Sequence, residues 1–306
     1  EWATTTISLG DSNRLDIIKE INFPHSIGLL YSAFTYYLGF KVNSGEYKVM
    51  GLAPYGIPKY KKIIFEKLID VKNDGSFKLN LDYFGYMTEL KMINYKFENL
   101  FKSKARNPEK EPINQFHMDI AASIQFVVEE IILKMTNNIQ KEYDCNYLCM
   151  AGGVALNCVA NGKILQSGSF KDLWIQPAAG DAGGSLGAAL AFWHLELKKN
   201  RSIELSDQMK GSYLGPKYSM SYIKNEFERE EAKYFELSEE ELINYAVNCL
   251  LDKKIIGWFQ GKMEFGPRAL GARSIIADPR DITMQKKLNL SIKYRETFRP
   301  FAPSIL

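Results

Sequence analysis

Histidine is scarce in this sequence: its 306 residues include only His25, His117 and His194, which lie far apart, and no H-x3-H pair occurs. A complete histidine-based metal site is therefore excluded from these 306 residues. His25 stands between a proline and a serine just before a predicted helix, and the other two lie on predicted helices. We expect structural roles, packing or capping, for all three.

Cysteine and long apolar runs are scarce too. The four cysteines include one C-x3-C pair, Cys145 and Cys149, in a predicted buried strand, where a thiol behaves as a small hydrophobe. No run of about 18 apolar residues and no leader-like opening is visible, so we expect a cytoplasmic protein without a membrane span. The net charge is +3, so no general field attracts nucleic acid or an anionic membrane. Local sites must carry the function.

Both ends of the sequence look strand-like. The chain begins inside "EWATTTISL" and closes inside "FAPSIL". We therefore expect a fragment of a longer protein, and an active site that is incomplete within these 306 residues.

The first half of the chain predicts an antiparallel start followed by helices. Residues 1–9 and 14–23 are rich in β-branched side chains and flank the turn "GDSN", which predicts two strands. Residues 25–40 predict a buried helix that Ser26 caps and Gly39 ends. Asn73-Asp74-Gly75 predicts a hairpin turn before a strand at 77–81.

A lysine-rich segment, residues 91–112, predicts a surface loop. From residue 114 to 143 apolar residues recur every three or four positions, which predicts a long amphipathic helix. Strands at 146–150 and 172–177 then alternate with helices at 154–166 and 185–199. This alternation with short links predicts an α/β layer with crossover connections.

Periodicity breaks over residues 200–218, which contain Gly211, Gly215 and Pro216, and a domain boundary is expected there. A helix at 239–252 and a strand at 254–261 follow.

Two glycine-rich turns follow the two strands of the α/β layer. The first contains Gly152 and Gly153, and the second contains Gly180, Asp181 and Gly183. Turns that open helices offer backbone N–H groups and a positive helix end, which suit a phosphate, and open α/β sheets bind ligands at such strand ends. The alternative is a tight turn that binds nothing. Asp181 fits either a metal ligand or a helix cap.

The stretch "GKMEFGPRALGARSIIADPRD" holds three arginines among glycines and prolines, beside an apolar strand. It suggests a fixed loop in which buried guanidinium groups hold an anion, and Arg268 is the strongest candidate. Arg273 and Arg280 leave two alternatives open, because they can equally form ion pairs with Asp278 or Glu264.

These motifs, with "GEYKVMGLAPYG" and "KYRETFRPFAP", resemble the nodulation-type and antibiotic-tailoring O-carbamoyltransferases in matching order over nearly the whole chain. The resemblance implies an α/β architecture. Residues 1–199 would form an N-terminally incomplete actin-like ATPase (RNase H-like) domain, similar to the tRNA threonylcarbamoyl transferase. Residues 212–306 would form part of an α+β domain similar to the threonylcarbamoyl-adenylate synthase.

The resemblance also implies the activity. Family members form carbamoyl adenylate from ATP and carbamoyl phosphate and pass the carbamoyl group to a hydroxyl of a sugar or natural product. Within "KYRETFRPFAP", Lys293, Arg295 and Arg299 resemble the K-x-R segment of the adenylate synthase, and the alternative is a solvated basic strand end. The implied catalytic residues are Arg268, Lys293 and Arg299. The implied nucleotide or phosphate contacts are Gly152, Gly153, Asn157, Gly180, Gly183 and Arg295.

The family also uses a divalent metal, here expected to be Fe(II). This sequence matches only one of its ligands, Asp181. Because "EWATT" resembles the tail of the family's D-G-x-G-E-W segment, the family's H-x3-H pair is expected just upstream of Glu1.

We expect an enzyme whose partners are small molecules: carbamoyl phosphate, ATP and a hydroxyl acceptor. Neither nucleic acid nor a membrane is expected, the assembly state is open and includes a homodimer, and the fragment is expected to be inactive alone. Two other classes stay open. A sugar kinase or ATPase of the same fold would not need the "EFGPRALG" domain, and a non-catalytic scaffold would be expected to lose Asp181 and the arginines.

Overall fold

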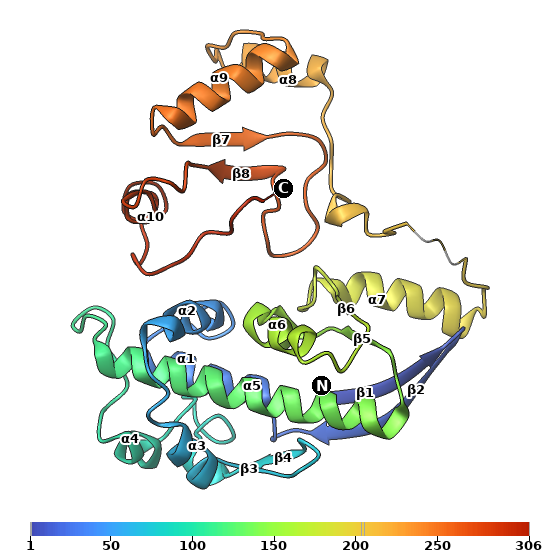
Figure 1. The fold of residues 1–306 in the computed structure, drawn as a ribbon, viewed down its shortest axis with the longest axis vertical. Helices are drawn as coiled ribbons and strands as arrows, with labels where there is room; N and C mark the ends of the chain where they lie inside the picture. The colour runs from blue at the N-terminus through green and yellow to red at the C-terminus, as the bar shows by residue number, and fades with distance from the viewer. Residues whose placement is uncertain (1, 203, 205, 306) are drawn as a thin grey trace. The chain divides into compact units, whose positions relative to one another are not determined.

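The computed structural model describes residues 2–202, 204 and 206–305. The chain divides into two compact units, Glu1–Arg201 (unit 1) and Ser202–Leu306 (unit 2), and each is described by itself (Figure 1). Both units mix helices and strands, as the sequence predicts, while the fold names that the resemblance implies stay predictions.

Unit 1 begins with the predicted pair of strands, β1 (Ala3–Asp11) and β2 (Arg14–Asn22), which are antiparallel. The predicted helix follows as α1 (Ile27–Tyr37). The hydroxyl of Ser26 caps it by accepting the N–H of Leu29 at 3.1 Å, and Gly39 has a φ of +74° just beyond its end. Both predicted end signals are confirmed.

Short elements come next. They are α2 (Glu46–Leu52), η1 (Ala53–Tyr55), α3 (Lys61–Lys67), the antiparallel hairpin of β3 (Ile69–Val71) and β4 (Phe77–Leu79), and η2 (Leu81–Tyr83). The predicted loop at 91–112 is wrong in part, because it contains the helix α4 (Tyr95–Phe101). Asn94 caps this helix, and the buried rings of Phe97 and Phe101, one turn apart, hold it against the core. Burial of these two aromatic rings stabilises a helix here, although the surrounding residues are polar enough to predict a loop.

The long helix is confirmed as α5 (Gln115–Tyr143), and it packs against α1, α2, α3 and α6 (Figure 1). Its apolar face, with Ile120, Ile124 and Ile131 fully buried, forms the centre of unit 1. Burial of a whole face of a helix is the main source of helix stability in proteins.

The predicted alternation follows as β5 (Tyr147–Met150), η3 (Gly153–Leu156), α6 (Cys158–Gln166), β6 (Asp172–Ile175), α7 (Gly183–Ala191) and η4 (Phe192–Glu196). β5 and β6 are parallel neighbours. The helix predicted at 154–166 is split at Asn157, whose side chain caps α6. The prediction that Cys149 lies in a buried strand is wrong, because this residue is exposed on the uncovered face of the two-stranded sheet. All four cysteines are free thiols.

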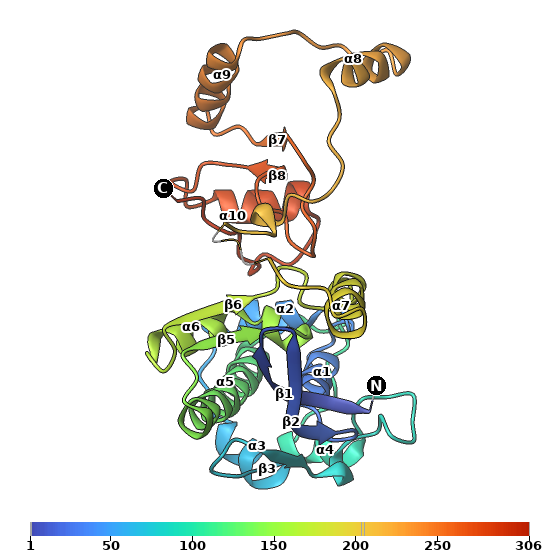
Figure 2. The same cartoon turned by 90° about the vertical axis from the view of Figure 1, so that its right-hand side faces the viewer.

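Unit 2 contains η5 (Lys210–Ser212), α8 (Met220–Arg229), α9 (Glu239–Leu251), β7 (Ile256–Phe259), β8 (Arg273–Ile276), α10 (Met284–Lys287) and η6 (Leu288–Ile292). The sequence predicts α9 and β7 and misses α8, β8 and α10. β7 and β8 are antiparallel. Figure 2 shows a long connection without helix or strand between α8 and α9. The strand expected at the chain end is wrong for residues 301–305, which form none.

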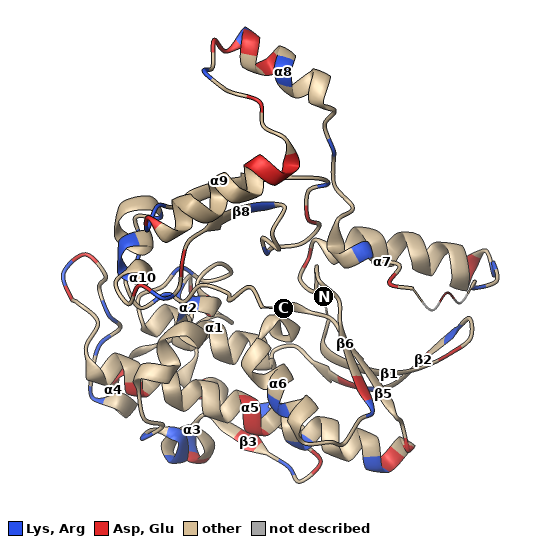
Figure 3. Ribbon diagram, turned by 45° about the horizontal axis from the view of Figure 1, so that its top comes forward, with Lys and Arg blue, Asp and Glu red and all other residues tan. Residues whose placement is uncertain are grey.

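Three acidic residues start α9, red in Figure 3, where they suit the positive end of the helix. Throughout the described part of the chain, none of the helices combines the length and the apolar character that crossing a membrane requires.

Candidate functional site

The three histidines have the structural roles that the sequence predicts. The Nδ1 atom of His25 accepts the N–H of Leu79 at 3.1 Å, and that of His117 accepts the N–H of Asn114 at 3.1 Å in a capping box at the start of α5. Burial lowers the pKa of both imidazoles. The Nδ1 atom of His194 lies 2.9 Å from the carbonyl oxygen of Lys199.

The two glycine turns lie side by side. Residues 151–157, here the first glycine turn, follow β5, and residues 176–183, the second glycine turn, follow β6. Because β5 and β6 are parallel neighbours, both turns leave the same end of the sheet. The N–H of Gly152 donates to the carbonyl of Ala179 at 2.6 Å and joins the turns directly. The sequence prediction that these turns follow the two strands of the α/β layer is confirmed.

The glycines in these turns are glycines for different physical reasons. Gly152 has a φ of +99°, a backbone conformation that other residues rarely adopt. A Cβ added to Gly183 would lie 2.2 Å from the carbonyl oxygen of Ala178, so close backbone packing requires glycine there. A Cβ added to Gly153 or Gly180 would meet no atom within 4 Å. Packing therefore does not require glycine at these two positions, and the space beside them is open.

Asn157 is buried at the junction of η3 and α6. Its Oδ1 atom accepts the N–H of Ala160 at 3.2 Å and the Nε2 group of Gln125 at 3.0 Å, and its Nδ2 group donates to the Oε1 atom of Gln125 at 3.1 Å. The amide is thus engaged within unit 1. A direct contact between Asn157 and a nucleotide stays a prediction.

Asp181 is exposed in the second glycine turn. The N-cap of α7 is Ala182, and no side chain accepts a hydrogen bond from the start of this helix. The capping alternative is therefore not what the structure shows.

Among the described residues, Asp181 is not part of a cluster of metal-ligating side chains. Over the described residues, His, Cys, Asp and Glu side chains nowhere gather in a group of three or more that could hold an ion. A divalent metal needs several such ligands. These residues alone do not fit the implied metal, and Asp181 supplies one carboxylate at most.

In unit 2 the glycine-arginine loop is organised around a buried carboxylate, Glu264. Its Oε1 atom accepts the backbone N–H groups of Leu270 and Ala272, each at 2.8 Å, and of Arg273 at 3.2 Å. Burial raises the pKa of Glu264, but these hydrogen bonds outweigh that effect and the pKa falls to about 2. Glu264 therefore closes the loop that carries Arg268. The expectation of buried guanidinium groups is wrong for Arg268 and Arg280, which are exposed.

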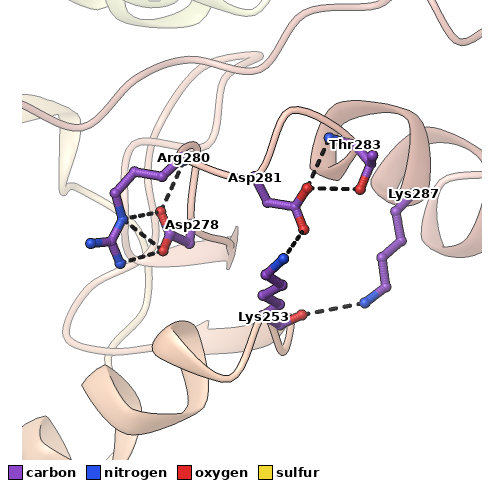
Figure 4. A network of polar contacts seen from close by, with 6 residues as sticks. All are labelled: Lys253, Asp278, Arg280, Asp281, Thr283 and Lys287. Carbon is purple, nitrogen blue, oxygen red and sulfur yellow. Dashed lines mark hydrogen bonds and ion pairs between the residues drawn. The ribbon is translucent and has the colours of Figure 1, made fainter.

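Arg280 forms the predicted ion pair with Asp278. Its Nε group lies 2.9 Å from both carboxylate oxygens, and a terminal nitrogen lies 2.5 Å from Oδ2 (Figure 4). The hydrogen bonds from Arg280 lower the pKa of Asp278 to about 2. Beside this pair the ammonium group of Lys253 lies 3.5 Å from the carboxylate of Asp281. The structural alternative is confirmed for Arg280.

Arg273 has a structural role as well, but not through a carboxylate. Its guanidinium group donates to the carbonyl oxygens of Gln260 at 2.7 Å and Gly261 at 3.2 Å, and it lies 3.4 Å from the centre of the Phe259 ring. Stacking and carbonyl contacts lock the end of β7 to β8.

The segment with Lys293, Arg295 and Arg299 folds around the fully buried side chain of Asn289. Asn289 accepts the Nε group of Arg295 at 2.6 Å and donates to the carbonyls of Thr297 at 3.2 Å and Arg299 at 2.9 Å. Lys293 is exposed, while Arg299 is only partly exposed, with a nitrogen 3.9 Å from the carboxylate of Glu296. The segment is not a strand, and the solvated alternative describes Lys293 alone.

Sequence reasoning missed three buried polar residues that organise these loops: Gln125, Glu264 and Asn289. The one signal for Gln125 is its place within the apolar face of a periodic helix, next to Ile124. The sequence suggests Glu264 only as an ion-pair partner of an arginine. Their hydrogen-bond partners depend on the folded chain.

Family models and curated proteins match this chain. A family model for the carbamoyltransferase N-terminus matches residues 1–190, and one for the carbamoyltransferase C-terminus matches residues 247–306. An uncharacterized protein of Synechocystis is 56% identical over 308 aligned residues, which cover all of this chain and 50% of that protein.

Nodulation proteins are similar too. NolNO of Sinorhizobium fredii is 36% identical over all of this chain and 43% of its own length. NolO of Bradyrhizobium diazoefficiens is 36% identical over 95% of this chain and 50% of its own length. The chain thus spans about half the length of the curated relatives it matches.

Proposed function

The chain belongs to the carbamoyltransferase family, and we propose that the full-length protein is an ATP-dependent O-carbamoyltransferase. It forms carbamoyl adenylate from ATP and carbamoyl phosphate and transfers the carbamoyl group to a hydroxyl of a sugar or natural product. The activity is proposed for the full-length protein because the 306 residues span about half of the relatives; the fragment alone is expected to be inactive.

One observation supports the proposal most strongly. In each unit, a loop that contains a family motif is fixed by hydrogen bonds to its backbone. In unit 1, the hydrogen bond from Gly152 to Ala179 joins two glycine turns at one sheet end. In unit 2, Glu264 fixes the loop that presents the exposed side chain of Arg268. Backbone N–H groups in a fixed turn and an exposed arginine are groups that commonly bind phosphate.

The residues of unit 2 would neutralise charge in adenylate formation. Arg268 and Arg299 supply planar forks that match phosphate oxygens two at a time, and Lys293 supplies a point charge. Phosphoryl and acyl-phosphate chemistry depends chiefly on such positioning and charge neutralisation. Water releases inorganic phosphate from carbamoyl phosphate and leaves carbamate, whose oxygen attacks the α-phosphorus of ATP and displaces pyrophosphate. The acceptor hydroxyl then attacks the carbamoyl carbon of the adenylate, loses its proton and displaces AMP.

The first glycine turn is proposed to bind nucleotide phosphates in unit 1, consistent with an actin-like ATPase fold for this part and an adenylate-synthase-like fold for unit 2. The expected partners remain small molecules. The implied divalent metal, expected to be Fe(II), finds one candidate ligand in Asp181, and no step of the reaction is derived through it.

The test measures pyrophosphate release from ATP and carbamoyl phosphate by the full-length protein. Arg268→Lys is expected to keep the fold and reduce release about tenfold to a hundredfold, because a lost charged hydrogen bond costs about 1.5–3 kcal/mol. Arg280→Lys is the matched control, since Arg280 is paired with Asp278. Absence of carbamoyl-phosphate-dependent release in the unaltered protein would overturn the function. Equal rates for both variants would overturn only the role of Arg268.

A further inference from the structure

A buried polar network crosses the apolar centre of unit 1 and ends at the first glycine turn. Its members are Tyr31 on α1, Gln125 and Glu129 on α5, and Asn157 and Lys163 on α6. All except Lys163 are buried. Buried polar groups stabilise a fold only when they are paired, so a network in this place restricts how the helices can pack.

Gln125 is the centre of the network, because its amide oxygen and its amide nitrogen each make two hydrogen bonds. The Oε1 atom accepts the hydroxyl of Tyr31 at 2.8 Å and the Nδ2 group of Asn157 at 3.1 Å. The Nε2 group donates to Glu129 at 2.7 Å and to the Oδ1 atom of Asn157 at 3.0 Å. Two donors and two acceptors complete the usual capacity of a glutamine amide.

The outer members fix which way this amide faces. The carboxylate of Glu129, held by the ammonium group of Lys163 at 2.6 Å, can only accept, so it must face the Nε2 group of Gln125. Burial raises the pKa of the Tyr31 hydroxyl well above its usual value, so the hydroxyl keeps its proton and donates to Oε1. One orientation of Gln125 satisfies both neighbours.

This orientation dictates that of Asn157. The paired amides of Gln125 and Asn157 leave the Oδ1 atom of Asn157 directed at the N–H of Ala160, where it caps α6. The Nδ2 group of Asn161 also donates to the carbonyl of Ala155, inside η3, at 2.7 Å. The far end of the first glycine turn is therefore fixed by α5, and its near end by the bond from Gly152 to Ala179.

We propose that Gln125 is a positioning residue, which acts through Asn157 to hold the first glycine turn in the geometry that binds the phosphates of a nucleotide. The proposal rests on the proposed function for the ligand, but its structural step does not. Gln125 itself is buried. A misplacement of about 1 Å in a positioned group can cost on the order of a hundredfold in rate, so rigid support from behind the turn has a functional consequence.

The experiment uses full-length protein and two readouts: hydrogen exchange at the amides of residues 153–160, and ATP affinity by calorimetry. Gln125→Leu removes all four hydrogen bonds, and Gln125→Asn is a milder variant that keeps an amide if the first does not fold. The matched control is Thr136→Val, which removes a buried hydroxyl on the same helix that bonds only to carbonyls of that helix. It separates positioning from a general loss of stability.

We expect both Gln125 variants to speed exchange in the turn and to weaken ATP binding, by about tenfold for Gln125→Leu, while Thr136→Val changes neither. Adding Gln125→Leu to Asn157→Ala is expected to cause no further loss of ATP affinity, because Gln125 acts on the turn through Asn157. Equal exchange in Gln125→Leu and Thr136→Val, or independent additive losses, would overturn the proposal. If the unaltered protein bound no ATP, the proposed function would fail while the exchange measurement still decided the structural step.

Discussion

The two units are held together in different ways. In unit 1, helices α1 and α5 bury large apolar side chains completely, among them Leu30, Phe34 and Ile124. In the described part of unit 2, the buried apolar side chains are those of Ala272, Met284 and Leu288. Helices α8 and α9 contain no buried residue at all.

Polar residues provide in unit 2 what apolar packing provides in unit 1. Glu264 and Asn289 are buried, and each gathers backbone groups from a loop that has no regular structure. A loop held by a single side chain depends on that side chain. We therefore expect core truncations to be costly in unit 1 and polar substitutions to be costly in unit 2.

The largest expected effect is that of Phe34→Ala in unit 1. Phe34 is 0% exposed, and its ring centre lies 5.1 Å from that of Phe97 and 5.8 Å from that of Phe101. Removing a buried ring should lower the free energy of unfolding by about 3–5 kcal/mol. Hydrogen exchange of the α5 amides measures this loss for unit 1 alone.

Leu242→Ala on α9 is the counterpart in unit 2. Leu242 is 42% exposed, so truncation should change the stability of unit 2 by less than about 0.5 kcal/mol. A loss in unit 2 as large as that in unit 1 would contradict the comparison.

The next effect concerns the carboxylate of Glu264. In Glu264→Gln, three backbone N–H groups lose a charged acceptor, which should cost unit 2 about 2–3 kcal/mol. Because the folded state lowers the pKa of Glu264 from 4.5 to about 2, its stabilisation is complete above pH 4.5 and is lost as the pH falls toward 2.

Acid unfolding of unit 2 checks this sign. It is followed by the fluorescence of Trp258 in a protein whose other tryptophans, Trp2, Trp174 and Trp193, are replaced by phenylalanine. The unaltered protein should lose stability over that pH window, and Glu264→Gln should lose less. If the two proteins had parallel pH profiles, Glu264 would not be the titrating group that holds the loop.

A smaller effect on stability is expected for Gly183→Ala in unit 1, and none is expected for Gly153→Ala. Gly183→Ala places a Cβ against the carbonyl of Ala178 and should cost about 1–2 kcal/mol of stability. Gly153→Ala meets no atom and should leave stability unchanged, but its methyl group would occupy the space proposed for a phosphate and weaken ATP binding about tenfold, or 1.4 kcal/mol. Thermal unfolding and calorimetry measure the two effects. Unchanged ATP affinity in Gly153→Ala would place the phosphates elsewhere.

The contrast between the units also explains what the sequence could predict. In unit 1, α5 follows from apolar periodicity, because a packed helix leaves its period in the sequence. The helix α1 follows from an apolar run between the end signals Ser26 and Gly39. The paired glycine turns follow from two apolar strands separated by a helix. In unit 2, α8 buries no residue, and β8 is a four-residue strand whose partner lies across a long loop.

The buried polar residues were not predictable for a related reason. Gln125 and Asn157 are 32 positions apart, and Asn289 reaches backbone carbonyls that belong to no helix or strand. No spacing rule connects such partners, because tertiary folding alone brings them together. Candidate ligand-binding residues such as Arg268 could be named from motifs, whereas the residues that support them could not.

The smallest expected effect on stability is that of Asp181→Asn. Asp181 is exposed and does not cap α7, so its replacement should change the free energy of unfolding by less than about 0.5 kcal/mol. If Asp181 is a metal ligand in the full-length protein, the same substitution should reduce the bound metal, measured by elemental analysis after purification, because an amide is a weaker ligand than a carboxylate. Asp207→Asn is a suitable control, since that carboxylate accepts backbone N–H groups in a turn of unit 2. A clear loss of stability without any loss of metal would show that Asp181 supports the second glycine turn. Loss of metal at constant stability would instead support a metal-binding role for Asp181 in the full-length protein.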